Sequence, residues 1–171
     1  MARKIRLPHE GEEIDLLLRQ TKEAVQETRT TVVAGVEITY SICDPWPLEP
    51  LGPDIAIYDH DGDIYVARGY AQADPTRADL AAFHEHIEIC HKLAGKDHGY
   101  AHHLALLQEF LAAKQEYDEN GLREYIHFRV FEYPDWKIPD KSAIEERICE
   151  ILSTASPLRG ELSEAIADAR M

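Results

Sequence analysis

The spacing of hydrophobic residues over the first forty positions predicts a helix followed by a strand. Over 10–28, apolar residues recur near helical spacing between charged ones, which favours an amphipathic helix. Residues 30–42, TTVVAGVEITYSI, are rich in β-branched side chains and partly alternate with polar ones. We interpret this stretch as one strand, because a pleated strand points successive side chains to opposite faces.

The next part of the chain predicts a loop and then a hairpin. Residues 43–53 hold four prolines and one glycine, so irregular structure is expected there. Two short runs rich in β-forming residues, 55–58 and 64–67, flank the sequence DHDG and predict a β-hairpin. This turn lacks the ligand spacing and the closing glutamate of a calcium-binding loop, so we interpret it as a plain turn.

Beyond residue 72 the hydrophobic spacing is helical up to the end of the chain. The first helix of this part should begin after Asp74 as its N-cap, with Pro75 in the first turn, and end at Gly95. The sequence ENG at 119–121 is interpreted as a helix break. Four further helices are predicted, over residues 100–117, 122–131, 141–153 and 158–170.

The order of these elements, a helix, then strands, then a run of helices, indicates an α+β fold. A length of 171 residues with 44% apolar residues suits a single domain with its own core. We therefore predict one domain over 1–171, with a sheet-containing half, 1–72, and a helical half, 73–171.

Charge and composition narrow the classes of partner. The chain carries 32 acidic and 18 basic residues, a formal net charge of −14, which argues against nucleic acid or an anionic membrane as partner. No apolar run approaches the roughly 20 residues of a transmembrane helix, and the N-terminus lacks the apolar segment of a secretory signal. Cys43, Cys90 and Cys149 are widely spaced and are expected to be reduced thiols that mostly fill the core. We expect a cytoplasmic protein.

Residues 83–92, FHEHIEICHK, place three histidines, two glutamates and one cysteine on the helix expected after Asp74. On a helical wheel, apolar residues occupy two sides of this segment and leave one polar wedge between them. Polar groups on a helix that is buried on two sides must be paired, solvated in a cleft or bound to a metal. The wedge consists of His84, Glu85, Glu88, His91 and Lys92.

Within this wedge, His84 and Glu88 are four residues apart, so both side chains can reach one metal ion. Glu85 lies about 100° further round the helix, where a general base can reach a water molecule without binding the ion. The arrangement is that of HExxH zinc helices, with a glutamate in place of the second histidine. His86 points away from the wedge and is expected to be structural or exposed.

A catalytic zinc site needs a third protein ligand, and the sequence HGYAHHLALLQE supplies candidates. A short glycine-containing loop would return the first turn of the next helix toward the end of the preceding one. We favour His102 as the third ligand and Glu109 as a further or supporting carboxylate. His103 and His91 stay possible additional ligands.

The motif HEHIE and the motif YAHHLALLQE, whose His102 lies fourteen residues after Glu88, together resemble a set of small zincin-like metalloproteins of bacteria and phages. The resemblance covers about residues 80–115. It implies a zincin-like fold in which His84, Glu88 and His102 bind the metal and Glu85 is the base.

The chemistry expected from such a site is hydrolysis by metal-activated water, with Glu85 accepting the proton of that water. His98 or Tyr100 would then donate to the oxyanion, although His98 by itself is expected to face solvent. One divalent ion is predicted, first Zn²⁺, with Mn²⁺ or Fe²⁺ as alternatives because a carboxylate is a hard ligand. The substrate would be a peptide or a small molecule.

Two other interpretations stay open. The repeated pattern ExxH, at 88–91 and at 124–127, is used by ferritin-like di-iron bundles, where Glu23 or Glu27 and Glu109 or Glu116 would complete the ligand set. A non-enzymatic interaction module, stabilised by metal or free of it, is the second alternative. It would present aromatic residues of the segment FRVFEYPDWKIP to a partner, namely Phe131, Tyr133 and Trp136.

Overall fold

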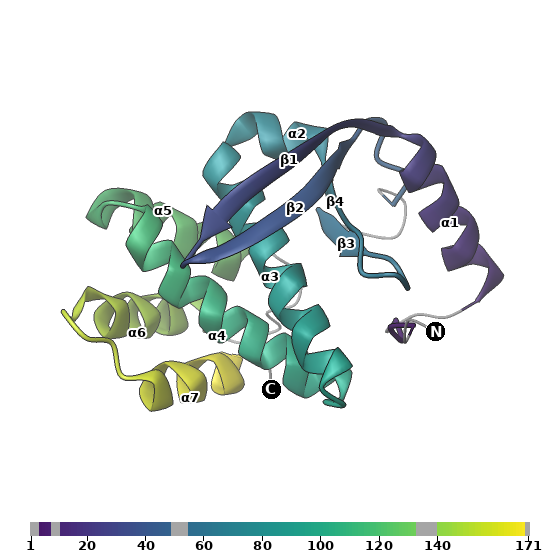
Figure 1. Cartoon of the computed structure of the whole chain (residues 1–171). Coiled ribbons are helices and arrows are strands. Elements are labelled where there is room, and N and C mark those ends of the chain that lie inside the picture. The colour runs from purple at the N-terminus through teal and green to yellow at the C-terminus, as the bar shows by residue number, and fades with distance from the viewer. Residues whose placement is uncertain (1–3, 8–10, 49–54, 133–139, 170–171) are drawn as a thin grey trace. The chain divides into compact units, whose positions relative to one another are not determined.

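A computed structural model of the chain describes residues 4–7, 11–48, 55–132 and 140–169. Within these ranges it is an α+β protein with seven α-helices, a five-residue π-helix and one mixed four-stranded sheet, as the sequence predicts at the level of class (Figure 1). The chain forms two compact units, 1–102 and 103–171, and each unit is described by itself.

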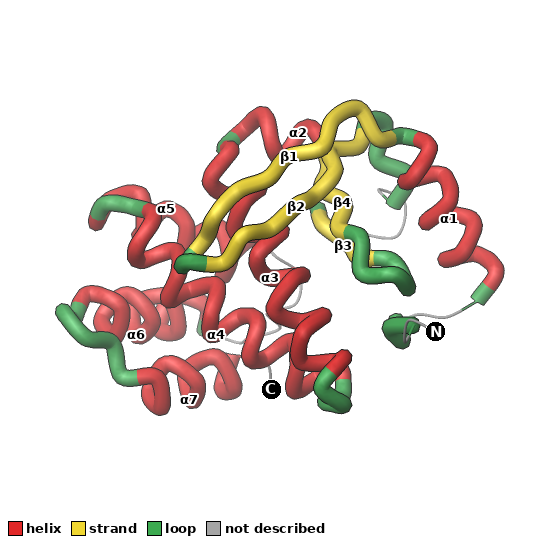
Figure 2. The backbone as a smooth tube through the Cα atoms, viewed as in Figure 1, coloured by secondary structure: helices red, strands yellow, loops and turns green. Residues whose placement is uncertain are grey.

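The first unit begins with helix α1 (Glu12–Glu23), which ends earlier than predicted. Strand β1 (Val25–Val33) follows directly and pairs antiparallel with β2 (Val36–Cys43), so the single strand predicted over 30–42 is wrong. The two strands meet at a two-residue turn, Ala34–Gly35, where φ is 49° and 78°. Positive φ at both central residues is the geometry of a tight hairpin turn, and Ala-Gly is a weak sequence signal for it. The long hairpin is plain in Figure 2.

The predicted second hairpin is confirmed: β3 (Ala56–Tyr58) pairs antiparallel with β4 (Ile64–Ala67). Strand β4 also pairs in parallel with the end of β2, which gives the strand order β1-β2-β4-β3. The DHDG turn between them is closed by the Asp59 side chain, whose carboxylate accepts the amides of Asp61 and Asp63. A six-residue helix that the sequence did not predict, α2 (Arg68–Ala73), leads out of β4.

Helix α3 (Pro75–Leu93) begins and ends as predicted and packs on the sheet. The Asp74 carboxylate accepts the amides of Thr76 and Arg77, and the left-handed Gly95 follows the last turn. Since α3 packs on all four strands, the compact units do not coincide with the predicted halves 1–72 and 73–171. The core of this unit consists of buried side chains from α3 and the sheet, including Ile38, Tyr40, Ile42, Val66, Leu80 and Phe83.

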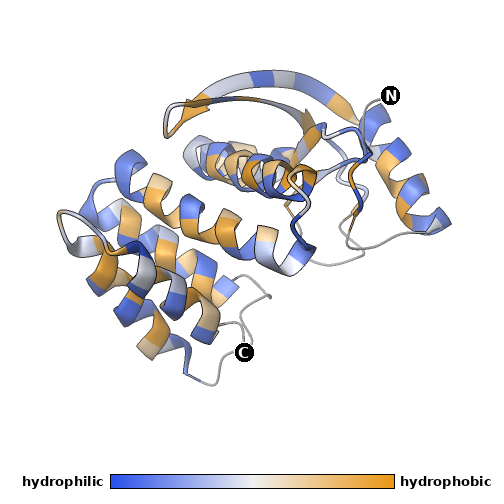
Figure 3. Cartoon of the chain, turned by 60° about the horizontal axis from the view of Figure 1, so that its bottom comes forward, coloured by the Kyte–Doolittle hydropathy of each residue, from blue (hydrophilic) through white to orange (hydrophobic). Residues whose placement is uncertain are grey.

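Helix α4 (His98–Glu116) contains the division between the two units. The second unit comprises the rest of α4, α5 (Glu119–His127), the π-helix (Phe128–Glu132), α6 (Lys141–Ser153) and α7 (Arg159–Ala169). The predicted break between two helices is present, but it lies before 119–121, because Asp118 caps α5 and its carboxylate accepts the Gly121 amide. Hydrophobic and hydrophilic residues alternate around these helices (Figure 3). The apolar positions build a core that includes Leu106, Phe110, Ile126, Ile148, Leu152 and Ile166.

Candidate metal centre

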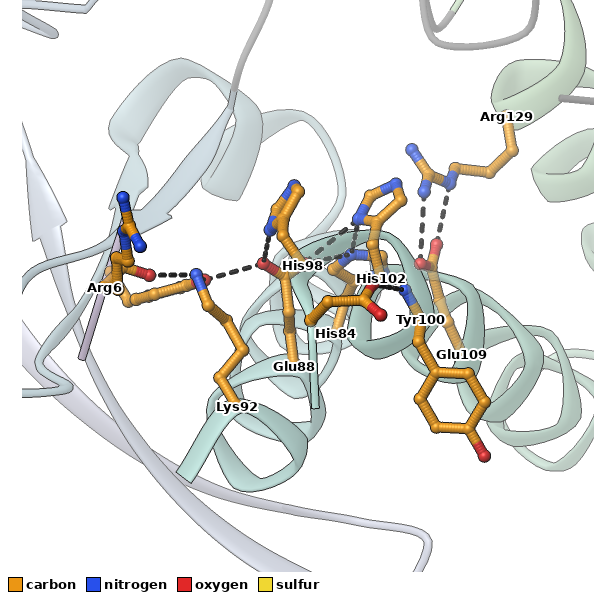
Figure 4. Close-up of polar contacts among 11 residues, drawn as sticks. Arg6, His84, Glu88, Lys92, His98, Tyr100, His102, Glu109 and Arg129 are labelled. Atoms are coloured by element: carbon orange, nitrogen blue, oxygen red, sulfur yellow. Dashed lines mark hydrogen bonds and ion pairs between the residues drawn. The ribbon is translucent and has the colours of Figure 1, made fainter. Parts of the chain in front are cut away.

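Three predicted ligands, His84 and Glu88 of α3 and His102 of α4, come together in the first unit (Figure 4). His102 Nδ1 lies 3.1 Å from His84 Nε2 and 3.0 Å from Glu88 Oε2, and the remaining pair, His84 Nε2 and Glu88 Oε2, is 3.6 Å apart. The two imidazole rings meet edge to face, with 4.8 Å between their centroids. Three atoms that can bind a metal ion therefore face one another at the corners of a small triangle.

Local signals in the sequence produce this geometry. The N-cap at Asp74 sets the start of α3, and the i, i+4 spacing then places His84 and Glu88 over one another on one face. After α3 ends, the Asp97 carboxylate accepts the Tyr100 amide and thereby begins α4. His102 follows in the first turns of α4, within reach of the α3 face.

The carboxylate of Glu88 is almost fully buried, with 3% of the residue exposed. Burial alone would raise its pKa, but interactions with the imidazoles of His102, His84 and His98 outweigh burial and lower the pKa well below its usual range. Glu88 is therefore ionised at neutral pH and accepts hydrogen bonds only. His102 Nδ1 faces both Glu88 Oε2 and His84 Nε2, so a proton on that nitrogen would be shared between two acceptors.

The other oxygen of Glu88 is held by Tyr58, which the sequence did not predict. The hydroxyl of Tyr58, at the end of β3, donates to Glu88 Oε1 at 2.7 Å. Burial and the negative charges of Glu88 and Glu85 raise the pKa of Tyr58 far above neutrality, so the phenol keeps its proton. Lys92 of α3 donates to the Tyr58 oxygen at 3.2 Å and to the backbone carbonyl of Arg6.

His98 also approaches this oxygen, with 3.0 Å between its Nδ1 and Glu88 Oε1. The prediction that His98 faces solvent holds only for part of the side chain, of which 42% is exposed. Its ring stacks on that of His102, with centroids 5.8 Å apart and an interplanar angle of 25°. His98 thus stands at the solvent side of the cluster. The sequence predicts His98 as a donor to an oxyanion and does not predict its contact with Glu88.

The predicted base, Glu85, is half-buried on α3. Its carboxylate lies close enough to Tyr58 for its charge to help raise the pKa of that phenol. Glu85 is thus near the residues that hold Glu88 but is separate from the three converging ligand atoms.

The structure does not bring the additional candidate ligands into this group. Among the described residues, the cluster of possible metal ligands consists of His84, Glu88 and His102 alone. His91 is half-buried one turn after Glu88, and His103 Nε2 pairs with the Ser163 hydroxyl at 2.7 Å in the second unit. Glu109 accepts from the guanidinium of Arg129, whose Nε lies 2.7 Å from Glu109 Oε1, and from the hydroxyl of Tyr125.

The side chains of the two ExxH motifs are each described within their own unit. Glu88 pairs with His84 instead of His91, Glu124 is exposed, and His127 Nδ1 pairs with Glu145 at 3.1 Å. Of the aromatic residues considered for partner binding, Phe131 is 37% exposed, and Tyr133 and Trp136 lie outside the described residues.

His86, the three cysteines and the possibility of a membrane span were also considered from the sequence. His86 is half-buried, and burial lowers its pKa. All three cysteines are free, as expected, but only Cys43 is buried, and burial raises the pKa of its thiol to about 11. None of the described helices is long and apolar enough to cross a membrane.

No protein-family model, curated protein or solved structure matches the chain. The resemblance to zincin-like metalloproteins therefore rests on the sequence motifs alone.

Proposed function

We propose that the protein binds one divalent metal ion through His84 Nε2, Glu88 Oε2 and His102 Nδ1, and that it is a metal-dependent hydrolase of zincin-like type. The observation that carries this proposal is the convergence of these three atoms in a largely buried place. A buried carboxylate and two imidazoles form a donor set suited to a cation, because each of the three atoms can offer a lone pair inward once no proton lies between them.

The size of the triangle supports this assignment. With metal–ligand distances of about 2.0–2.2 Å, a tetrahedral ion separates neighbouring ligand atoms by about 3.3–3.6 Å, and an octahedral ion by about 3.0 Å. The three observed distances, 3.0, 3.1 and 3.6 Å, span these values. Zn²⁺ is the first choice because two of the ligands are imidazoles, and Mn²⁺ or Fe²⁺ are the alternatives because the third is a carboxylate.

Three protein ligands leave at least one position for water and substrate, as in catalytic zinc sites. An ion bound there would supply a Lewis acid and a water molecule of lowered pKa. Glu85 is proposed as the base that accepts the proton of this water, and the effect of its charge on Tyr58, the residue that donates to Glu88, supports this role. The exposed part of His98 faces solvent next to the cluster, where it can contact the oxygen of a peptide or small-molecule carbonyl.

A second candidate function is a metal-stabilised interaction module without catalysis. The observation in its favour is that the ligands come from two consecutive helices, so that an ion would link α3 to the start of α4. Metal binding would then appear as added stability with no reaction.

Elemental mass spectrometry of the purified protein tests metal binding, which both candidate functions require. We expect about one zinc per chain in the wild-type protein and none in His84→Ala and His102→Ala. His91→Ala is the matched control on the same helix and should keep the metal. A folded wild-type protein that takes up none of Zn²⁺, Mn²⁺ or Fe²⁺ would refute the site.

The variant Glu85→Gln distinguishes a hydrolase from a metal-stabilised interaction module. As an enzyme, the metal-loaded wild type hydrolyses a member of a peptide and amide library, and Glu85→Gln keeps the metal but loses roughly 10²–10⁴-fold in rate. The enzyme is refuted if Glu85→Gln turns over the same substrate at the wild-type rate.

A further inference from the structure

Glu88 has two oxygens, and the structure treats them differently. Oε2 faces His84 and His102, whereas Oε1 accepts the Tyr58 hydroxyl at 2.7 Å and lies 3.0 Å from His98 Nδ1. A carboxylate on a metal ion can bind through one oxygen or through both. Which of the two occurs depends on whether the second oxygen is occupied by another partner.

Tyr58 is well suited to occupy that oxygen permanently. It is 3% exposed, and it lies at the end of a strand on which α3 packs, so its ring is fixed by the core. Its single hydroxyl proton can point to only one acceptor. Lys92 donates to the Tyr58 oxygen at 3.2 Å, and because an ammonium group cannot accept, the phenol proton is directed to Glu88.

Lys92 is itself anchored on the side away from Tyr58. Its Nζ also donates to the backbone carbonyl of Arg6, in a short segment whose neighbours Ile5 and Leu7 are buried. Ile5 exchanges two bonds with His60 of the β3–β4 turn, one through its amide and one through its carbonyl, both 2.9 Å long. A continuous series of contacts thus runs from the N-terminal segment through Lys92 and Tyr58 to Glu88.

We propose that Tyr58, oriented by Lys92, is a positioning residue that holds Glu88 as a ligand through one oxygen only. The inference rests on the proposed metal site. It adds Tyr58, a residue that supports the ligand Glu88 without binding the ion itself. Groups that support metal ligands in this way typically change metal affinity by 10–100-fold when they are removed. Tyr58→Phe should therefore weaken metal binding by about that factor, although no ligand is lost.

Tyr65→Phe is the matched control. Tyr65 lies on the neighbouring strand β4, is also 3% exposed, and also donates to a carboxylate, Asp59 Oδ2, at 3.0 Å. Both variants remove one hydroxyl that a buried tyrosine of the same sheet donates to a buried carboxylate. A loss of metal affinity that came from a loosened sheet would therefore occur in both, and a loss that came from positioning of Glu88 would occur only in Tyr58→Phe.

The experiment measures Zn²⁺ and Co²⁺ affinity by competition with a chromophoric chelator, together with the visible absorption of bound Co²⁺, which reports the number and arrangement of its ligands. The proteins are the wild type, Tyr58→Phe, Tyr65→Phe, Lys92→Met and the double variant Tyr58→Phe/Lys92→Met, each checked for folding by circular dichroism. We expect a 10–100-fold loss and an altered Co²⁺ spectrum in Tyr58→Phe, and neither change in Tyr65→Phe.

Lys92→Met should show a smaller loss, and the double variant should resemble Tyr58→Phe alone, because Lys92 acts through Tyr58. If Tyr58→Phe fails to fold, Lys92→Met is used for the test, and the inference is overturned if Lys92→Met binds metal as tightly as the wild type.

The inference is also overturned, with the metal site intact, if a folded Tyr58→Phe binds metal as tightly as the wild type. An equal loss of affinity in Tyr65→Phe has the same meaning. A folded wild type that binds neither ion overturns both proposals.

Discussion

Two buried glutamates of this chain, Glu88 in the first unit and Glu109 in the second, have their negative charge balanced in different ways. Glu88 is 3% exposed and Glu109 is 2% exposed, and each accepts a hydroxyl from a tyrosine. Glu109 faces the guanidinium of Arg129, which carries its positive charge at any pH the protein meets. Glu88 faces imidazoles, whose charge depends on pH.

The comparison separates a structural ion pair from a candidate metal site. The Glu109–Arg129 pair is complete, since the fixed cation leaves no charge to be balanced by a ligand. At Glu88 the positive charge is conditional, and two imidazole nitrogens converge on the same oxygen. A divalent cation can replace the shared proton there but has no role beside Arg129. Four predictions test this difference, from the largest expected effect to the smallest.

Arg129→Met should destabilise the protein most, by about 3–5 kcal/mol, because it leaves the Glu109 carboxylate buried without its cation. Urea denaturation measures the loss. Removing both charges, in Glu109→Gln/Arg129→Met, should restore much of it. Arg147→Met breaks an exposed pair with Asp168 and is the control, with an expected loss below about 1 kcal/mol. Equal losses in Arg129→Met and Arg147→Met would contradict the assignment of a buried structural pair.

Added metal should stabilise the protein through Glu88 and not through Glu109. At a free Zn²⁺ concentration of about 100 times Kd, the free energy of unfolding should rise by about 2.7 kcal/mol in the wild type. The gain should vanish in His84→Ala and persist in the double variant of the Glu109 pair. Calorimetric melting with and without Zn²⁺ measures it. A gain that survives in His84→Ala would place the bound ion elsewhere.

Metal affinity should fall as the pH drops below the ordinary imidazole range of about 6.5, because protons compete for the ligand nitrogens. With two imidazole ligands the limiting loss is about a hundredfold per pH unit. The carboxylate does not contribute in this window, since its neighbours lower the pKa of Glu88 and it stays ionised there. Chelator competition between pH 8 and pH 5 measures the slope. An affinity independent of pH over this range would exclude the histidines as ligands.

The smallest effect is expected for His127→Gln, which removes an exposed pair with Glu145. Such pairs contribute about 0–1 kcal/mol, and His127 is part of the second ExxH motif but not of the ligand cluster. Metal content should therefore stay at one ion per chain. Loss of the metal in His127→Gln, or two iron ions per wild-type chain, would favour the di-iron alternative.

Parts of the site could be predicted because they depend on neighbours in the sequence. The i, i+4 spacing places His84 and Glu88 on one face of any helix, and the cap at Asp74 and the stop at Gly95 define that helix. A short loop made His102 the favoured third residue. The α+β class followed from the change of hydrophobic period after residue 72, although the Ala34–Gly35 turn was missed because alanine is uncommon at a position of positive φ.

The sequence by itself determined where the helices of the site begin and end and which residue types share the face of α3. Only the tertiary structure decided that Glu109 pairs with Arg129, twenty residues further on. It also decided that Glu88 accepts a hydrogen bond from Tyr58, thirty residues before it. The physical reason is that helix phase and caps act over a few residues, whereas a buried charge is balanced by whichever group the packing of distant elements brings to it.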